Sequence, residues 1–289
     1  MKKNFLFFPL FILFFSNIFT QDEYDYETMW LSFPACHMGR LQSPVRLNIS
    51  ESKYSNSFSI VYQYFSNIKL NNSISDFKEP QPSIYLTLDN DSKGYINLQR
   101  NGVIKQYTFD HIEIFRGLHK IESSKSQFEV HLIFKKNLGF STNQNQYRRI
   151  TDANNYLAIV LRYNKTSSLS DNSILLVSDG GLINDLINKN NLEFSNYPIF
   201  DRRAFFYEGS QIYNPCSEDY NYIVLYDTFY SQNNLTENFP DSNWGKRDFA
   251  HSYDRPIYRN FMNYTETISS GFIKINLIKI IGFLTIIIL

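Results

Sequence analysis

"YTFDHIEIFRG" at residues 107–117, followed by "FEVHLIF" at residues 128–134, decides the fold of this chain. β-branched and aromatic residues dominate both stretches, which favours β-strands. Side chains alternate between the two faces of a strand, so His111 and Glu113 share one face of the first stretch. The second stretch adds His131. Zinc accepts imidazoles and carboxylates as ligands, so these strands raise the question of a metal site.

The same β pattern continues along the chain. Alternating or continuously apolar stretches, separated by turn signals such as Asn101-Gly102, are typical of strands in a covered sheet. Further strands are predicted at residues 57–65, 83–90, 95–99, 157–164 and 220–229. One amphipathic helix is predicted within residues 180–194, and no internal repeat is visible. We therefore predict a mainly β, single domain with short peripheral helices.

Composition and motifs narrow the function classes. The 289 residues include 28 basic and 28 acidic side chains, so the formal net charge of zero gives no electrostatic basis for binding nucleic acid. The 26 Phe and 21 Tyr residues supply a sizeable core. The sequence contains no Gly-x-Ser-x-Gly elbow, phosphate-binding loop, Cys-x-x-Cys pair or His-Glu-x-x-His motif. These absences leave the strand-borne cluster as the candidate site.

Both ends of the chain suggest a route to the cell surface. Residues 1–20 combine a short basic start, an apolar run and a polar exit, which is typical of a secretory signal peptide. Residues 263–289 end in an apolar tail preceded by small residues at 269–271, a pattern typical of a GPI-anchor signal. The alternative is a short transmembrane helix, although two lysines interrupt the tail. Residues 21–262 would then be a membrane-anchored extracellular domain.

Cysteines and sequons agree with an oxidising compartment. An even pair of cysteines far apart in a secreted chain suggests one long-range disulfide, here between Cys36 and Cys216. Asn-x-Ser/Thr sequons are candidates for glycosylation. They occur at Asn48, Asn71, Asn90, Asn164, Asn234 and Asn263.

Two blocks of sequence resemble the α-class carbonic anhydrase family. "CHMGRLQSPVRL" at residues 36–47 resembles the Cys and Gln-Ser-Pro-Ile near the start of secreted members, and "YEGSQIYNPCSEDYNYIVL" at 207–225 resembles the late Gly-Ser…Pro-Cys block. "DRPIYR" at 254–259 resembles the late Asn-x-Arg-Pro-x-Gln. The resemblance covers roughly residues 30–260. It implies a large, twisted, mostly antiparallel sheet, a bond between the two cysteines, and a zinc position on the central strands.

The family's zinc site is held by three imidazoles, two from a His-x-His strand and one from the next strand. With Gly117 aligned on the family's glycine, the resemblance places Glu113 and Phe115 at the first two ligand positions and His131 at the third. Glu129 matches the family's carboxylate that orients a ligand imidazole. One imidazole, one carboxylate and one phenyl ring do not make a zinc site of this kind, so no cofactor is expected.

Two further family residues are replaced in this chain. Leu118 stands where the family has a buried Glu, and Tyr213 stands where it has the catalytic Thr. In the family these two groups bond each other and orient the zinc-bound hydroxide. Their joint loss implies a catalytically inactive, carbonic-anhydrase-related protein that serves as a binding or adhesion module. Its extracellular partner or ligand is not specified by the sequence.

The alternative is an active zinc enzyme. A two-residue slip of the strand would preserve its alternation and would place His111 and Glu113 as ligands beside His131. Zinc accepts a His₂Glu set elsewhere, so this alternative predicts a Zn²⁺-dependent carbonic anhydrase that hydrates carbon dioxide.

Overall fold

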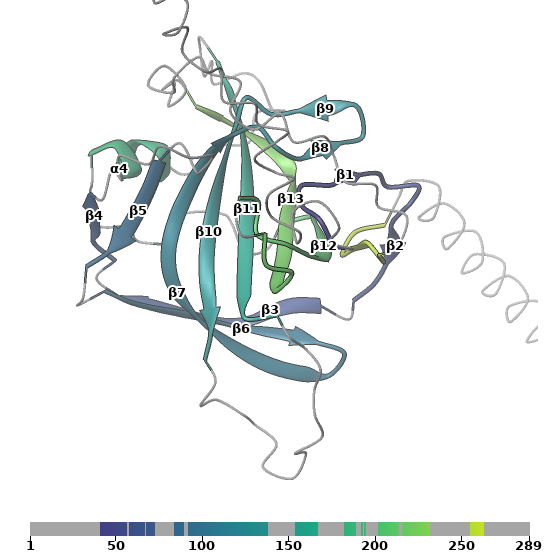
Figure 1. The fold of residues 1–289 in the computed structure, drawn as a ribbon, viewed down its shortest axis with the longest axis horizontal. Coiled ribbons are helices and arrows are strands. Elements are labelled where there is room, and N and C mark those ends of the chain that lie inside the picture. Colours follow the sequence, from purple (N-terminus) through teal and green to yellow (C-terminus); the bar gives the residue numbers. More distant parts are fainter. Residues whose placement is uncertain are drawn as a thin grey trace, which may run out of the picture.

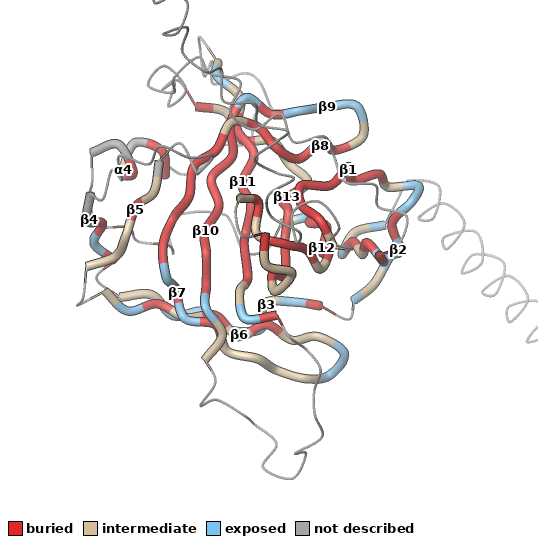
Figure 2. Tube along the Cα trace, in the orientation of Figure 1, coloured by how far each residue is buried: buried red, intermediate tan, exposed pale blue. Residues whose placement is uncertain are grey.

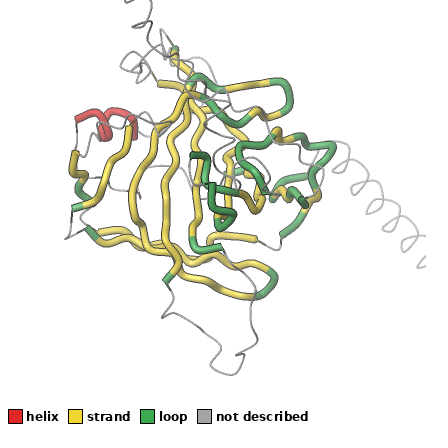
Figure 3. Tube along the Cα trace, in the orientation of Figure 1, coloured by secondary structure: helices red, strands yellow, loops and turns green. Residues whose placement is uncertain are grey.

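The computed structural model describes residues 41–56, 58–66, 68–72, 84–89, 92–137, 154–166, 182–188, 192, 194, 202–213, 216–231 and 255–262. Strands dominate these residues (Figure 3). Those in the first half of the chain are β1 (Arg46–Leu47), β2 (Lys53–Tyr54), β3 (Phe58–Ser66), β4 (Leu70–Asn72), β5 (Ile84–Leu88), β6 (Lys93–Arg100) and β7 (Val103–Arg116). They are followed by β8 (Lys120–Ile121), β9 (Ser124–Lys125), β10 (Phe128–Lys136), β11 (Tyr156–Lys165), helix α4 (Leu182–Asn188), β12 (Ala204–Gly209), β13 (Tyr220–Ser231) and β14 (Tyr258–Arg259).

An 11-stranded sheet forms the body of the protein, in the order β2-β14-β12-β13-β11-β10-β7-β5-β4, with β6 also pairing β7 and β3 pairing β6. Most neighbours are antiparallel, whereas β11 pairs β13 and β14 pairs β2 in parallel. Figure 1 shows the tall, curved strands β7, β10, β11 and β13, with β3 and β6 crossing below them. A small second sheet has the order β1-β8-β9. The prediction of a mainly β, mostly antiparallel single domain is confirmed.

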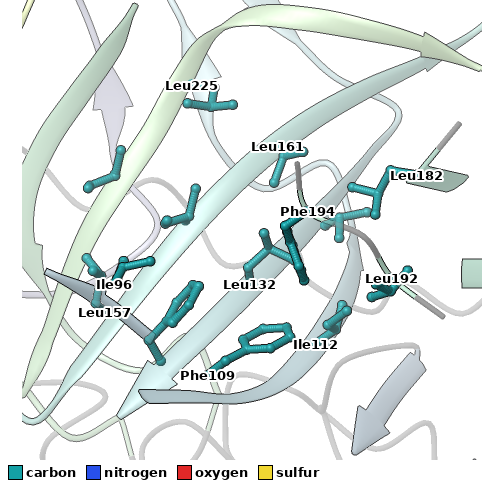
Figure 4. Packing of buried hydrophobic residues seen from close by; sticks show 14 of the residues in the cluster. Ile96, Phe109, Ile112, Leu132, Leu157, Leu161, Leu182, Leu192, Phe194 and Leu225 are labelled. Atoms are coloured by element: carbon teal, nitrogen blue, oxygen red, sulfur yellow. The ribbon is translucent and has the colours of Figure 1, made fainter. Parts of the chain in front are cut away.

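The central strands are buried on both faces over most of their length, which Figure 2 shows as red along β10 and β11 except at their ends. Because alternate side chains point to opposite faces, each strand contributes to two cores. Leu132 of β10 and Leu161 of β11 pack in the core that Figure 4 shows, with Phe109 and Phe194. Ile133 belongs to the other core, on the face that carries the candidate site.

Two glycines fix the approach of neighbouring segments to this face. A Cβ on Gly117 would lie 1.8 Å from the carbonyl oxygen of Ser126, and a Cβ on Gly209 would lie 2.2 Å from Oγ of Ser43. Neither contact is tolerable, so both positions require glycine. Gly117 also donates its N–H to the carbonyl of Gln127 at 2.9 Å, which locks the end of β7 to the start of β10.

Other predictions are met in part by the described residues. The amphipathic helix is present as α4, with Leu182, Ile183 and Leu186 buried. Cys216 is disulfide-bonded, while Cys36 lies outside the described residues. Within the described part of the chain, no helix is long and apolar enough to cross a bilayer. The expected signal peptide and the C-terminal anchor lie outside these residues.

The sequons are only partly described. Asn48 is 7% exposed, which makes it a poor acceptor for a glycan. Asn164 lies in β11, and its Oδ1 accepts a hydrogen bond from the N–H of Gln127. Asn71 lies in β4. Asn90, Asn234 and Asn263 lie outside the described residues.

Candidate functional site

Strands β7 and β10 bring the predicted site residues onto one face. In the antiparallel ladder Glu113 is directly opposite His131, and Phe115 is directly opposite Glu129. Opposed residues in such a ladder project from the same face. The Phe115 ring packs on the His131 imidazole, with 4.7 Å between ring centroids. The structure therefore places a carboxylate and a phenyl ring beside the single family-type imidazole.

Glu129 is the hub of a buried network below His131. Its Oε1 accepts hydrogen bonds from the N–H groups of Leu118 and His119, at 3.0 and 2.6 Å. Its Oε2 accepts from His119 Nδ1 at 2.8 Å and from His131 Nε2 at 3.0 Å. Although burial opposes the charge, these imidazole contacts hold the pKa of Glu129 well below its usual range. Glu129 is therefore a buried carboxylate.

This network fixes the state of both imidazoles. Burial lowers the pKa of His119, so the ring is neutral; it donates from Nδ1 to Glu129 and accepts at Nε2 from the hydroxyl of Tyr207, at 2.7 Å. A carboxylate can only accept, so His131 must carry its hydrogen on Nε2. Its Nδ1 is left buried and without a hydrogen-bond partner. The carboxylate thus orients the His131 ring and leaves Nδ1 without a hydrogen-bond partner.

A second cluster surrounds Glu113. Its Oε1 accepts hydrogen bonds from Tyr213 Oη at 2.5 Å and from His111 Nε2 at 3.0 Å. The other ring nitrogen of His111, Nδ1, lies 2.6 Å from Oδ2 of Asp110. The Tyr85 ring packs on the imidazole, with 4.4 Å between centroids. Glu113 is thus committed to partners within the protein.

The cluster changes the acidity of its members. Burial alone would lower the pKa of His111, but hydrogen bonds to Asp110 and Glu113 outweigh it and raise this pKa to about 9. His111 is therefore an imidazolium at neutral pH that donates to both carboxylates. Burial and the neighbouring Glu113 raise the pKa of Tyr213, and burial with Asp110 and Glu113 raises that of Tyr85 to about 12. Both phenols stay protonated, and Tyr213 donates to Glu113.

The imidazolium predicts a pH-dependent stability. The pKa of His111 is about 9 in the folded protein, compared with 6.5 for an unperturbed histidine in the unfolded chain. Protonated His111 therefore makes its full contribution to the free energy of unfolding below pH 6.5. That contribution is lost as the pH rises to about 9, and it amounts to on the order of 3 kcal/mol. Urea unfolding at pH 6, 7.5 and 9.5 should show this loss in the natural chain and in Tyr85→Phe, which keeps the imidazole. The loss should be absent from His111→Gln; an unchanged pH profile in that variant would contradict the assignment.

The resemblance aligns Leu118 and Tyr213 with the family's hydroxide-orienting pair. Leu118 is buried in the apolar core of this face, and its side chain offers no acceptor. The hydroxyl of Tyr213 bonds Glu113 rather than residue 118. Tyr213 also packs near Phe115, with 6.4 Å between ring centroids. Residues 118 and 213 therefore make no hydrogen bond to each other through their side chains. Leu118 is apolar, and the hydroxyl of Tyr213 donates to Glu113 instead.

The residues present do not fit zinc at the family's position. Phe115 has no lone pair, and the Glu113 oxygen Oε1 is already bonded to two donors. Among the described residues, the one group of three potential ligand residues whose ligand atoms all lie within 4.8 Å of one another is His119, Glu129 and His131. Hydrogen bonds already join these three side chains at 2.8 and 3.0 Å, and backbone donors occupy Oε1 of Glu129. That group is an orienting network, since its donors and acceptors satisfy one another. The alternative ligand set of His111, Glu113 and His131 does not form such a group in the structure.

Several partners in the site escape sequence reasoning. Regular alternation would place Asp110 on the opposite face of β7 from its neighbour His111. In the structure the β7–β10 register breaks between Ile133 and Phe134, and Asp110 has no partner residue in that ladder. Tyr85 comes from β5, whose residue 85 pairs with Glu113. The strand pattern at residues 83–90 predicted β5, but it did not predict that β5 pairs with β7.

Known proteins share this architecture. A sequence model of the eukaryotic-type carbonic anhydrase family matches residues 25–266. The α-carbonic anhydrase from Thermovibrio ammonificans, solved with sulfanilamide, is 13% identical with a TM-score of 0.55, over 79% of this chain and 91% of that chain. The Photobacterium profundum α-carbonic anhydrase is 15% identical with a TM-score of 0.55, over 80% and 95%. Dioscorin complexed with ascorbate is 14% identical with a TM-score of 0.54, over 81% and 91%.

Identities this low establish the fold alone, and no curated protein matches the chain in sequence. The family match, in contrast, spans most of the chain and includes every strand described above. The chain therefore belongs to the eukaryotic-type carbonic anhydrase family.

Proposed function

We propose that this family member does not hydrate carbon dioxide and acts as a binding or adhesion module. The observation that carries the proposal is the contact of Glu113 with Tyr213 and His111, next to a phenyl ring at position 115. Two of the three family ligand positions are thereby occupied by groups that either bond inside the protein or cannot bind metal. The family reaction requires a hydroxide that a zinc ion generates near neutral pH. The proposal is supported by a donor set that lacks two of the three imidazoles with which the family holds that ion.

The proposed setting is the cell surface. Residues 1–20 would direct secretion, residues 21–262 would form the extracellular domain, and residues 263–289 would provide a GPI anchor or a short transmembrane helix. The disulfide at Cys216 supports an oxidising route. The partner would be an extracellular protein or ligand rather than nucleic acid, in keeping with the zero net charge. Release of the protein from cells by a GPI-cleaving phospholipase would distinguish the first kind of anchor from the second.

One observation favours the alternative of a zinc enzyme. The Nδ1 atom of His131 is buried and has no hydrogen-bond partner, as a metal-ligating nitrogen would be without its ion. For an active site, Glu113 and His111 would have to give up their mutual bond and turn toward that atom. The alternative therefore requires a rearrangement of the cluster, whereas the binding-module proposal requires none.

Metal content and hydratase activity separate the two functions. We expect the purified natural protein to contain far less than one zinc per chain by elemental analysis, even after incubation with zinc and removal of the excess. We also expect no sulfonamide-sensitive hydration of carbon dioxide, because the donor set lacks two imidazoles. An active α-carbonic anhydrase treated in parallel is the positive control. Stoichiometric zinc that is lost in His131→Ala, together with hydratase activity, would establish the alternative.

A further inference from the structure

Three tyrosines form an exposed aromatic surface on β3 and β6, the two strands that cross below the tall central strands (Figure 1). Tyr62 and Tyr64 are 50% and 43% exposed. Each packs on Tyr95, with 5.8 and 5.5 Å between ring centroids and angles of 33° and 32° between the ring planes. We call these three residues the tyrosine platform. Single exposed apolar side chains are ordinary, but aromatic rings that gather in one place are typical of a binding surface.

Polar side chains extend the tyrosine platform across the sheet. Tyr95 pairs with Thr108 of β7. In the next row Tyr62 pairs with Asn97, which pairs in turn with Gln106. Directly opposed residues project from the same face, and the bond from Gln106 Nε2 to Asn97 Oδ1 at 3.3 Å shows these two amides side by side. Because Thr108 is exposed and both amides are partly exposed, this face offers phenol rings, a hydroxyl and two amides to solvent.

The two amides are held in place and can still bond a ligand. A carboxamide has two N–H donors and an oxygen with two lone pairs. Asn97 accepts at Oδ1 from Gln106, and Gln106 accepts at Oε1 from Asn137 at 3.0 Å. These bonds fix the amide planes, and the Nδ2 group of Asn97 takes part in neither of them. A hydroxyl group, which both donates and accepts, is a suitable partner for such an amide.

The charge of this face limits the class of ligand. None of its phenol, hydroxyl and amide groups is charged at neutral pH. Lys135 pairs with Thr108 at one border and is attracted to the carboxylate of Asp110. Lys93, two residues before Tyr95, is a single exposed cation at another border. A nucleic acid requires clustered basic side chains along its phosphates, so an uncharged ligand fits this face better.

Two features disfavour a protein partner at β3. Within the described residues β3 pairs with β6 alone, but a bulge between Ile60 and Tyr62 interrupts its ladder. Bulges on an edge strand hinder the addition of another strand. At about 200 Å² per tyrosine side chain, the exposed part of the platform amounts to roughly 200–300 Å². Each partner in a stable protein interface buries about 800 Å², so the platform suits a ligand of a few rings.

We propose that the tyrosine platform binds a neutral oligosaccharide, whose sugar rings pack on the phenol rings and whose hydroxyl groups bond with Asn97 and Gln106. A sugar ring presents C–H groups on its faces and hydroxyl groups at its edge, which complements aromatic rings bordered by amides. The inference names a ligand class for the proposed binding module and rests on that proposal for its role. None of its residues belongs to the Glu113 or Glu129 cluster. Sugar binding by a protein that also held zinc would therefore leave this inference standing while contradicting the proposed loss of catalysis.

Calorimetric titration of the purified natural protein tests the class of ligand. The neutral probes are chitohexaose, cellohexaose and maltohexaose, and the anionic probe is a heparin hexasaccharide. We expect saturable binding of at least one neutral probe at one site per chain, with an affinity that added salt does not change, since no ion pair is involved. Failure of all three neutral probes to bind, or tighter binding of the heparin hexasaccharide that weakens with salt, would overturn the proposal.

Tyrosine variants test the location. Tyr62→Ala and Tyr64→Ala should each weaken binding of the neutral probe by about tenfold or more, as removal of a central aromatic anchor does. Tyr64→Phe should retain most of the affinity because it keeps the ring. The matched control is Tyr54→Ala, at a tyrosine of β2 that is 44% exposed, and it should bind as the natural protein does.

All four variants change exposed side chains, so circular dichroism should show them folded. Their zinc content should equal that of the natural protein, because the platform is separate from the zinc position. A folded Tyr64→Ala protein that binds the probe undiminished, or an equal loss in Tyr54→Ala, would place the ligand elsewhere and sink the proposal.

Discussion

A variant carrying Glu113→His, Phe115→His and Tyr213→Thr should bind about one zinc ion per chain, as three convergent imidazoles do in related sites. The third imidazole is already prepared, because Glu129 holds the hydrogen of His131 on Nε2 and leaves the buried Nδ1 lone pair free. The Thr removes the phenol that now bonds position 113. The gain from negligible to stoichiometric zinc is the largest metal-binding change expected of any variant of this site.

Zinc binding should also raise stability, since a ligand that binds only the folded state stabilises it by about 2.7 kcal/mol at a hundredfold excess over Kd. Elemental analysis and thermal unfolding with and without zinc measure both effects. The control is the same variant with His131→Ala, which removes the pre-oriented nitrogen and should lose the ion. We measure metal binding rather than hydratase activity, because the variant keeps Leu118 at the position where the family has a buried Glu. If zinc remained in the control, the ion would be held elsewhere, and the assigned register of β7 would be wrong.

The fold was predictable because it follows from local strand patterns and from two sequence motifs typical of the family, at residues 36–47 and 207–225. The alternation in β7 and β10 specifies strands whatever their neighbours are. The block around Cys216 and the strand that follows it identify the family without a gap. The register of β7 was more difficult, since a slip by two residues preserves alternation. In the structure the β7–β10 ladder sets Glu113 opposite His131 and Phe115 opposite Glu129. Gly117 is required where β7 ends, because a side chain there would collide with the Ser126 carbonyl.

The polar connections of the site were not predictable in the same way. Tyr213 and Glu113 are 100 residues apart in sequence, and the family pattern places a threonine with a different partner at that position. Asp110 reaches His111 at 2.6 Å only because the ladder is irregular there. A regular strand would direct neighbouring side chains to opposite faces. Periodicity therefore identifies which strands carry the site, whereas hydrogen bonds between distant segments require the folded chain.

Replacing Glu129 by alanine should cost about 3–5 kcal/mol of folding free energy, the loss typical of removing one partner from a buried charged network. The carboxylate accepts four hydrogen bonds, so its removal leaves donors of His119, His131 and Leu118 buried without acceptors. It also removes the negative charge opposite Arg162, which is 1% exposed and lies across the β10–β11 ladder from Glu129. The guanidinium would then be a buried cation without that counter-charge.

Urea unfolding at pH 7 measures this loss, with Glu51→Ala as the matched control, because Glu51 is exposed and should change stability by less than about 0.5 kcal/mol. Glu129→Gln separates charge from shape. The amide oxygen can still accept from the two backbone N–H groups, but the NH₂ group then presents donors to the two imidazoles. A cost smaller than that of alanine is expected, together with a shift of the His131 hydrogen to Nδ1 that nitrogen chemical shifts would detect. If Glu129→Ala were as stable as the exposed control, the hydrogen bonds of the buried network would not contribute to stability, and the orientation of His131 would need another cause.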